Sequence, residues 1–376
     1  MNFTINSNDL LNKLNLLTKA QNSKNTIPIL DCVKVELTQG YITLTTSNNE
    51  ITLVTKLPVS EESDINQKIC IKSSLLLDAL RELPNQPIEI IANDSNYNVE
   101  IRYKSGHFLF VGQSAEEYPG IVSLPDNANE ITLPASVVLT AIQNTLACQA
   151  DDELRPIMNG TYCDFHTDGD VVFVSSDGHR LARDTFHNLN TSGQSFGFVL
   201  PAKTTQLLKN VLDKLSEDIS FSFNNSNAVV KAGDTIVYSR LLEGRYPNYN
   251  SVIPIDNSII VIIDRNSIIS TLRRIMVFAS DSTGLIALNV KGNDLKVSAE
   301  NLDFSQSSEE TIFCEHSGND ISIGFKGTLL HDLLKLMPAG NIKLHFSSHN
   351  HAGIITPAEQ GDEEEILMLL MPMQLQ

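Results

Sequence analysis

The chain contains six short apolar strands, each followed by a segment whose apolar positions recur every three to four residues, as in an amphipathic helix. The first strand of each set begins at Phe3, Ile131 and Val261, so the sets repeat in steps of 128 and 130 residues. A second strand and helix follow inside each set. The pattern predicts six helices, in residues 7–24, 72–83, 135–149, 202–216, 265–280 and 326–337.

Stretches that alternate apolar and polar residues follow the second helix of each set, from residues 88, 219 and 342. Their period of two, broken by Asn, Gly and Asp, predicts meandering antiparallel strands. We therefore expect an α+β fold of three similar domains, each made of two half-units in which a strand, a helix and further strands follow one another. Pro, Asn and Asp interrupt the pattern near 123–130 and 251–258, which predicts domains at 1–127, 128–253 and 254–376.

Length and composition fit this organisation. A chain of 376 residues with 41% apolar and 19% charged residues is typical of a globular protein with two or three domains. It has no apolar run near the roughly 18 residues of a membrane span, and its start lacks the apolar core of a secretory signal, so we expect a cytoplasmic protein without membrane contact. The five cysteines are odd in number and far apart, which favours reduced core thiols over disulfides or a zinc site.

The charge is unevenly distributed. A formal charge of −18 argues against a nucleic-acid partner, because Lys and Arg supply most non-specific DNA affinity. However, 13 of the 27 basic residues lie in the six predicted helices, together with only five of the 45 acidic ones. Helices of this kind could line a positive channel inside a negative shell. The alternative is that Lys and Arg are simply good helix formers on solvated faces.

Five motifs in order resemble the bacterial sliding clamp family, the beta subunit of DNA polymerase III, over the full length of the chain. They are IPIL at 27–30, RPIMNG at 155–160, SSDGHRLA at 175–182, LLEGRYPNY at 241–249 and LLMPMQL at 369–375. The resemblance implies a DNA clamp fold with antiparallel sheets outside and helices lining a ring closed by a head-to-tail homodimer. It also implies a non-catalytic processivity factor that needs no cofactor and no metal. In this family ATP is used by the clamp loader and not by the clamp.

The ring of this family encircles duplex DNA and needs only sequence-independent phosphate contacts, which permit sliding. Lys24 matches a basic position that faces DNA in the family. The other DNA-facing candidates are basic residues of the predicted helices: Lys72, Lys203, Arg265, Arg273 and Arg274.

The family also implies a pocket between the second and third domains, where the replicative polymerase, repair polymerases and other partners dock a short clamp-binding peptide. An apolar floor of Leu and Met can repack around different side chains. Carried over by position, the pocket residues are Arg155, Ile157, Met158, Ser176, Gly178, His179, Arg180, Leu181, Pro247, Val252, Leu369, Leu370, Met371, Pro372 and Met373.

The resemblance further places Phe108 of one copy against Phe278 and Ala279 of the other at the dimer interface. Three departures from the family pattern affect the pocket. Pro156 and Ile157 follow the arginine of the first pocket motif, where an aromatic residue is common. Asn250 and Ser251 replace an arginine that many members carry after YPNY, and Gln374 replaces another.

Two other classes of protein remain as alternatives. In an enzyme, Asp177 and His179 could form an acid/base or metal pair, although Asp177 and Gly178 also fit a simple turn. A surface array of three β-rich modules would instead be monomeric and secreted. The acidic run 361–365 could bind a cation, but a solvated loop before the last strand is the stronger interpretation. The sequence lacks GxxxxGK(S/T), GxGxxG after a strand and GxSxG, which are the commonest signatures of nucleotide-binding and hydrolase sites.

Overall fold

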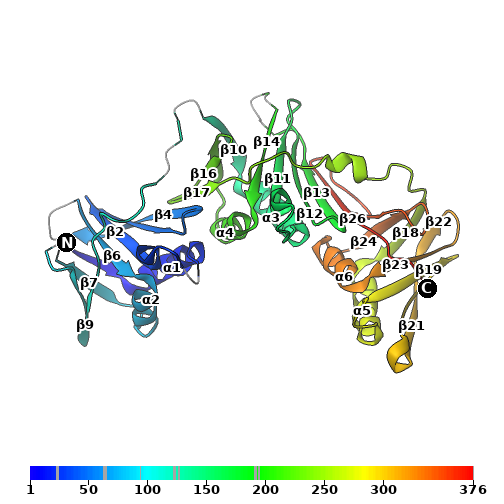
Figure 1. The fold of residues 1–376 in the computed structure, drawn as a ribbon, viewed down its shortest axis with the longest axis horizontal. Coiled ribbons are helices and arrows are strands. Elements are labelled where there is room, and N and C mark those ends of the chain that lie inside the picture. Colours follow the sequence, from blue (N-terminus) through cyan, green and yellow to red (C-terminus); the bar gives the residue numbers. More distant parts are fainter. Residues whose placement is uncertain are drawn as a thin grey trace. The chain divides into compact units, whose positions relative to one another are not determined.

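The computed structural model describes residues 1–22, 25–61, 66–93, 95–121, 124–125, 128–189, 193 and 195–375. The chain forms two compact units, and Figure 1 shows the helices and strands along the sequence. The first comprises Met1–Leu139 and Lys203–Leu241, and the second comprises Thr140–Ala202 and Leu242–Gln376. The middle repeat therefore contributes to both units.

All six predicted helices are present, each shorter than its predicted segment. They are α1 (Ser7–Leu17), α2 (Ser73–Arg81), α3 (Ala135–Thr145), α4 (Ala202–Leu212), α5 (Arg265–Ile275) and α6 (Gly327–Leu336). Short 3-10 turns continue α1, α3 and α5 as η1 (Thr18–Ala20), η3 (Leu146–Cys148) and η6 (Met276–Phe278). Lys72 and Lys326 precede their helices as N-cap residues, at the ends of the preceding strands.

The first unit contains two antiparallel sheets. The five-stranded sheet has the order β5 (Ser60–Glu61), β1 (Asn2–Asn6), β7 (Pro87–Ala92), β8 (Asn98–Tyr103) and β9 (Gly106–Val111). The eight-stranded sheet has the order β10 (Asn129–Pro134), β15 (Asp218–Phe223), β16 (Asn227–Ala232), β17 (Thr235–Arg240), β4 (Ile51–Pro58), β3 (Tyr41–Ser47), β2 (Cys32–Thr38) and β6 (Gln67–Lys72).

The second unit also contains two antiparallel sheets. The nine-stranded sheet has the order β14 (Phe196–Pro201), β11 (Gly160–Phe165), β12 (Val171–Ser176), β13 (Arg180–Phe186), β26 (Glu364–Leu370), β25 (Gly353–Pro357), β24 (Asn341–Phe346), β18 (Ile259–Asp264) and β22 (Glu315–Ser317). The four-stranded sheet has the order β21 (Gln306–Phe313), β20 (Asp294–Asn301), β19 (Leu285–Lys291) and β23 (Ile321–Lys326).

Strand pairing joins consecutive repeats. In the first unit β4 pairs with β17, and in the second unit β13 pairs with β26. Each pair unites the third strand after the first helix of one repeat with the third strand after the second helix of the next repeat. The corresponding strands β21 and β9 are edge strands in their sheets.

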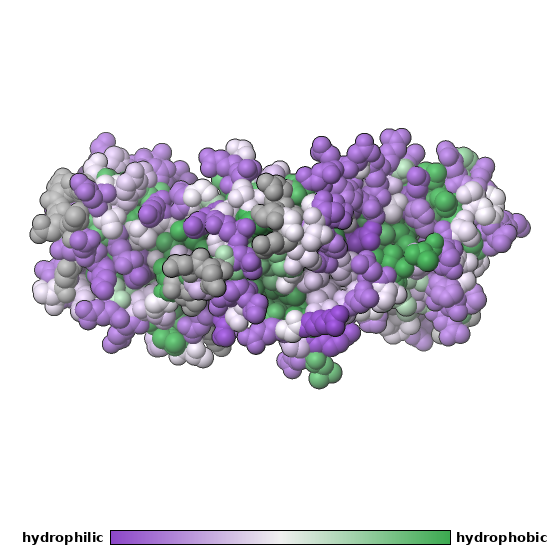
Figure 2. All heavy atoms as spheres, turned by 90° about the horizontal axis from the view of Figure 1, so that it is seen from above, coloured by the Kyte–Doolittle hydropathy of each residue, from purple (hydrophilic) through white to green (hydrophobic). Residues whose placement is uncertain are grey.

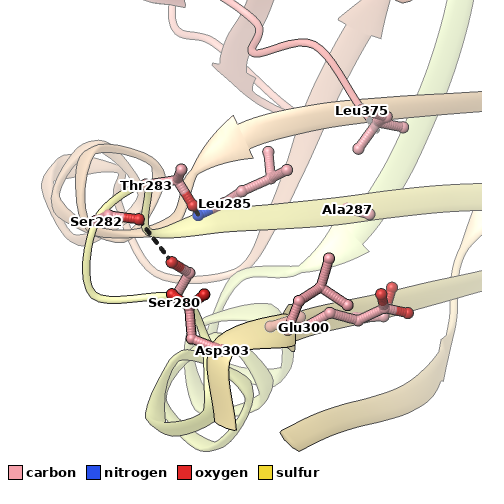
Figure 3. A pocket seen from close by; sticks show the side chains of 11 residues that line it. Ser280, Ser282, Thr283, Leu285, Ala287, Glu300, Asp303 and Leu375 are labelled. Carbon is pink, nitrogen blue, oxygen red and sulfur yellow. Dashed lines mark hydrogen bonds between the residues drawn. The ribbon is translucent and has the colours of Figure 1, made fainter. Parts of the chain in front are cut away.

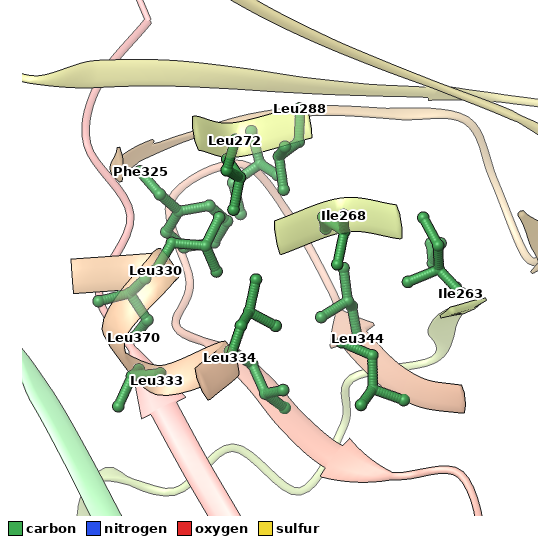
Figure 4. Packing of buried hydrophobic residues seen from close by; sticks show 14 of the residues in the cluster. Ile263, Ile268, Leu272, Leu288, Phe325, Leu330, Leu333, Leu334, Leu344 and Leu370 are labelled. Atoms are coloured by element: carbon green, nitrogen blue, oxygen red, sulfur yellow. The ribbon is translucent and has the colours of Figure 1, made fainter. Parts of the chain in front are cut away.

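The core of the second unit shows how the helices are held. Asp264 caps α5 by accepting a hydrogen bond from the backbone N–H of Ser267 at 2.7 Å, which satisfies a donor that the helix leaves unpaired. Ile268, Leu272 and Ile275 then face the sheets and are at most 3% exposed. They pack with apolar residues of α6 and of both sheets (Figure 4). All five cysteines are buried and free, as expected.

Replacement of Leu334 in α6 tests this packing. Leu334 is fully buried, so Leu334→Ala should cost about 2–5 kcal/mol of unfolding free energy through lost transfer energy and a residual cavity. Ile255→Ala removes a fully exposed side chain and should change the free energy by less than about 0.5 kcal/mol. Urea denaturation followed by circular dichroism measures both, and equal losses would contradict the packing.

Candidate functional site

The DGHR motif forms a tight turn between β12 and β13. Gly178 has φ +89°, a conformation that glycine adopts without strain. One carboxylate oxygen of Asp177 accepts the backbone N–H groups of His179 and Arg180, each at 2.9 Å, and the other accepts Nε of Arg180 at 2.9 Å. The Asp177 carboxylate therefore stabilises the turn, as the structural alternative predicted.

Both arginines of the candidate pocket are paired within the chain. Arg180, with 14% of its side chain exposed, also lies 3.6 Å from a carboxylate oxygen of Asp332 in α6. Arg155 pairs with Asp152 at 2.9 Å. A Cβ on Gly178 would lie 3.3 Å from the Arg155 guanidinium, so the first two pocket motifs are in contact.

The β13–β26 pairing brings the C-terminal motif to the same place. Arg180 lies opposite Leu370 and Leu181 opposite Leu369, and the backbone N–H of Met371 donates to the carbonyl of His179 at 2.8 Å. Ile157 packs against the buried cluster that contains Leu181 and Leu369. The motifs at 155–182 and the distant C-terminal motif thus meet in one part of the second unit.

The candidate pocket residues differ in their exposure. Met158, Leu181, Leu369 and Leu370 are at most 5% exposed and act as support. Ser176 holds the turn by donating its hydroxyl to the carbonyl of Arg180. Met373 pairs with Gly324 of β23, and Pro372 is half-buried. The exposed members are Arg155, Gly178, His179, Pro247, Val252 and Met371.

An aromatic cluster that we did not select from the sequence supports this surface. The rings of Tyr162 and Tyr246 stack with centroids 4.9 Å apart, and the Tyr249 hydroxyl donates to Asp164 at 2.9 Å. Tyr246 and Tyr249 belong to the LLEGRYPNY motif, so the motif itself was the available signal. These residues pack in the same cluster as Leu181 and Leu369.

The basic candidates fall into two groups. Lys72 and Arg273 are exposed, whereas Lys24 lies outside the described residues. Lys203 donates to Asn22 at 2.5 Å and to the carbonyl of Gln21 at 3.1 Å, and burial lowers its pKa. Arg265 donates to the carbonyls of Leu334 and Lys335 at the end of α6. Arg274 pairs with Glu310 at 2.5 Å. Lys203, Arg265 and Arg274 therefore already interact with other groups of the protein.

The dimer candidates lie beside the two edge strands. Phe108 belongs to β9 and packs against Tyr103 with ring centroids 4.9 Å apart. Phe278, 40% exposed, ends η6, and Ala279 follows it. Large apolar side chains are also exposed along both edges: Leu109 and Val111 in β9, and Phe313 in β21.

Other surface features involve residues outside the candidate pocket set, although Leu375 of the last motif lines one of them. Figure 2 shows hydrophilic residues over much of one face, with apolar residues gathered in patches between them. A hollow of about 590 Å³ lies in the second unit between the loop after η6 and the end of β20, where the hydroxyls of Ser280 and Ser282 are hydrogen-bonded at 2.9 Å (Figure 3). Glu300, Asp303 and Leu375 also line it. No pattern in the sequence indicated this hollow.

The acidic run 361–365 is only partly a loop. Glu364 and Glu365 belong to β26, and Glu365 pairs with Arg183.

Within the described part of the chain, no group of three His, Cys, Asp or Glu side chains is placed to hold a metal ion. Among the same residues, no helix has the length and apolar character needed to cross a membrane.

Comparisons with known proteins agree with the motifs. Family models of the DNA polymerase III beta subunit match in sequence order: the N-terminal domain at residues 1–123, the central domain at 132–248 and the C-terminal domain at 250–374. The beta sliding clamp of Lactococcus lactis is 27% identical over 379 residues and covers 98% of each chain. That of Bacillus subtilis is 25% identical over 382 residues and covers 99% of each.

Solved structures give the same result. The DNA polymerase beta subunit of Streptococcus pyogenes has a TM-score of 0.93 at 25% identity, and a sliding clamp of Pseudomonas aeruginosa has a TM-score of 0.93 at 23% identity. Each comparison covers the whole of both chains. The α+β architecture of three similar domains is thus the DNA clamp fold.

A protein with this fold and these motifs is a sliding clamp. The chain belongs to the DNA polymerase III beta subunit family, the beta sliding clamps, and is a non-catalytic processivity subunit of that polymerase. The resemblance inferred from the motifs is confirmed, and the enzyme and surface-array alternatives no longer apply.

Proposed function

We propose that two copies of this chain close head to tail into a ring that encircles duplex DNA and tethers polymerases to it. The observation that carries the proposal is the repeated strand pairing. Two of the three junctions that the repeats can make, β4–β17 and β13–β26, occur within one chain. The third would join β21 of one copy to β9 of another, which makes each contact heterologous and allows a dimer to close.

The two edge strands are chemically suited to this junction. Unpaired strand edges with exposed apolar side chains invite pairing with another chain, and Leu109, Val111 and Phe313 are each at least 67% exposed. Phe108, Phe278 and Ala279 remain the proposed dimer contacts. The three proposed domains of each copy are residues 1–127, 128–253 and 254–376.

An acidic protein can hold DNA by topology, because encirclement needs only diffuse contacts with phosphate. We propose Lys24, Lys72, Lys203, Arg265, Arg273 and Arg274 as DNA-facing residues. Lys72 and Arg273 are the most direct candidates, since they are exposed and form no ion pair with another described residue, whereas the exposed Arg274 pairs with Glu310. The residues carried over by family position form the proposed peptide pocket, and the clamp loader and polymerases of the cytoplasm are the proposed partners.

Topology can be tested on circular DNA. The clamp is loaded on nicked circular DNA with ATP and the clamp loader of the same organism, and the DNA is then cut once. The ring should remain on the circle and leave the linear product, because free ends release a topological link. Gel filtration of the protein–DNA mixture measures retention. Retention on linear DNA with open ends would exclude encirclement.

The dimer contact can be tested by charge. Phe278→Asp places a carboxylate in the proposed apolar contact, where an unpaired charge is costly, so the mass from light scattering should fall from twice 41.5 kDa to 41.5 kDa. Leu154→Asp, at a side chain 92% exposed, is the control and should leave the mass unchanged. A Phe278→Asp protein that stays dimeric at micromolar concentration would place the interface elsewhere.

The pocket can be tested with a fluorescein-labelled peptide from the clamp-binding segment of the same organism's replicative polymerase. Met371→Glu should weaken binding at least about tenfold, a change of about 1.4 kcal/mol, because it replaces an apolar contact with a charge. Leu75→Glu is the matched control, since Leu75 and Met371 are both 44% exposed and only Met371 is in the proposed pocket. Fluorescence anisotropy measures both, and equal losses would remove Met371 from the pocket.

A further inference from the structure

Two carboxyl groups face each other across the β13–β26 pairing. Asp184 of β13 is fully buried, and Glu364 of β26 is half-buried. Ile366 lies opposite Asp184, and Phe186 lies opposite Glu364. Since side chains alternate between the faces of a strand, Asp184 and Glu364 are diagonal neighbours on one face. Oδ1 of Asp184 and Oε1 of Glu364 are both buried, and neither has a hydrogen-bond partner among the described residues.

The surroundings of this pair provide little to neutralise it. From α3, Asn144 donates its side-chain N–H to one oxygen of Asp184 at 2.8 Å. From β12, Phe173 lies opposite Asp184. Arg183 is next in sequence, but it points to the other face of the strand, where it pairs with Glu365. Glu364 is the charged neighbour that helps to raise the pKa of Asp184.

Two ionised carboxylates have only acceptors, so a hydrogen bond between them requires a proton. Without that proton, Oδ1 of Asp184 and Oε1 of Glu364 are both buried acceptors with no donor, and the charge of the fully buried Asp184 would be repelled by that of the half-buried Glu364. Burial, with a smaller contribution from the neighbouring Glu364, raises the pKa of Asp184 to about 7. Burial also raises the pKa of Glu364.

We propose that Asp184 and Glu364 share one proton, and that this proton stabilises the β13–β26 pairing and so positions the two strands that carry Arg180, Leu181, Leu369 and Leu370. Both acids are positioning residues in this scheme. The shared proton does not depend on the proposed function, whereas its effect on the peptide pocket rests on it. The clamp would thus bind its partner peptides less well as the proton is lost.

The direction of the pH effect follows from the raised pKa of Asp184. The folded chain keeps a proton that the unfolded chain releases near the ordinary aspartate pKa of 3.8. This contribution to stability is therefore complete below that pH, and it is lost as the pH rises through about 7. Above that pH the folded protein carries a fully buried carboxylate at Asp184 beside the half-buried carboxylate of Glu364, and the two charges repel.

Replacement of Asp184 by asparagine tests the shared proton. The introduced amide would donate to Glu364 and accept from Asn144, and so imitate the protonated acid. Asp184→Asn should leave Tm nearly unchanged at about pH 5 and raise it by on the order of 3 °C at about pH 8.5. In infrared difference spectra near neutral pH, the wild type should show the carbonyl band of a protonated carboxylic acid, and the variant should lack it.

Glu365→Gln is the matched control, because Glu365 neighbours Glu364 on the same strand but points to the other face. It should change Tm by a similar amount at both pH values. An Asp184→Asn protein whose Tm falls at both pH values, or a wild type without the carboxylic acid band, would overturn the proposal.

The polymerase peptide then tests the link to the pocket. Its affinity for the wild type should fall about threefold or more between about pH 6 and about pH 8.5, while Asp184→Asn keeps the affinity of the lower pH. A parallel decline in both proteins would overturn the positioning role. If the peptide bound neither protein at any pH, the pocket of the proposed function would be wrong, and the melting and infrared results would still decide the shared proton.

Discussion

Antiparallel pairing between strands of different repeats is the interaction on which the rest of the structure depends. In β4–β17 and β13–β26 the backbone of one repeat completes the sheet of the next. Backbone hydrogen bonds fix the register, and a slip by one residue would move every side chain to the other face. The meeting of the DGHR turn with the C-terminal motif follows from one such register, in which Leu181 lies opposite Leu369.

The two faces of the paired strands β13 and β26 carry different sets of side chains. The inner face of β13 and β26 carries apolar residues such as Ile366 and Met368 into the core that includes α5 and α6, whereas the other face carries Leu181 and Leu369 with the tyrosine cluster. Because both strands are covered on both faces, a polar residue there must find a partner. Arg183 pairs with Glu365, whereas Asp184 accepts a hydrogen bond from Asn144 and lies diagonally across from Glu364.

Local periodicity was sufficient to predict the six helices and the α+β class, because the apolar face of a helix or strand is encoded by neighbouring residues. The motifs were sufficient to predict the family. Long-range pairing was not predictable in this way: Asp184 and Glu364 lie in different repeats, and nothing in their local sequence indicates that they meet. The same holds for Lys203 and Arg265, whose partners Asn22 and Leu334 lie in distant segments.

Arg265 combines a structural and a proposed electrostatic task. Its guanidinium donates to two carbonyls at the C-terminal end of α6, where a cation also interacts favourably with the helix dipole. A lysine would keep the charge but not the forked geometry that reaches both oxygens. A change of charge at this position would therefore also disturb the fold. We expect the charge of the proposed DNA channel to evolve through positions such as Lys72 and Arg273, which are exposed.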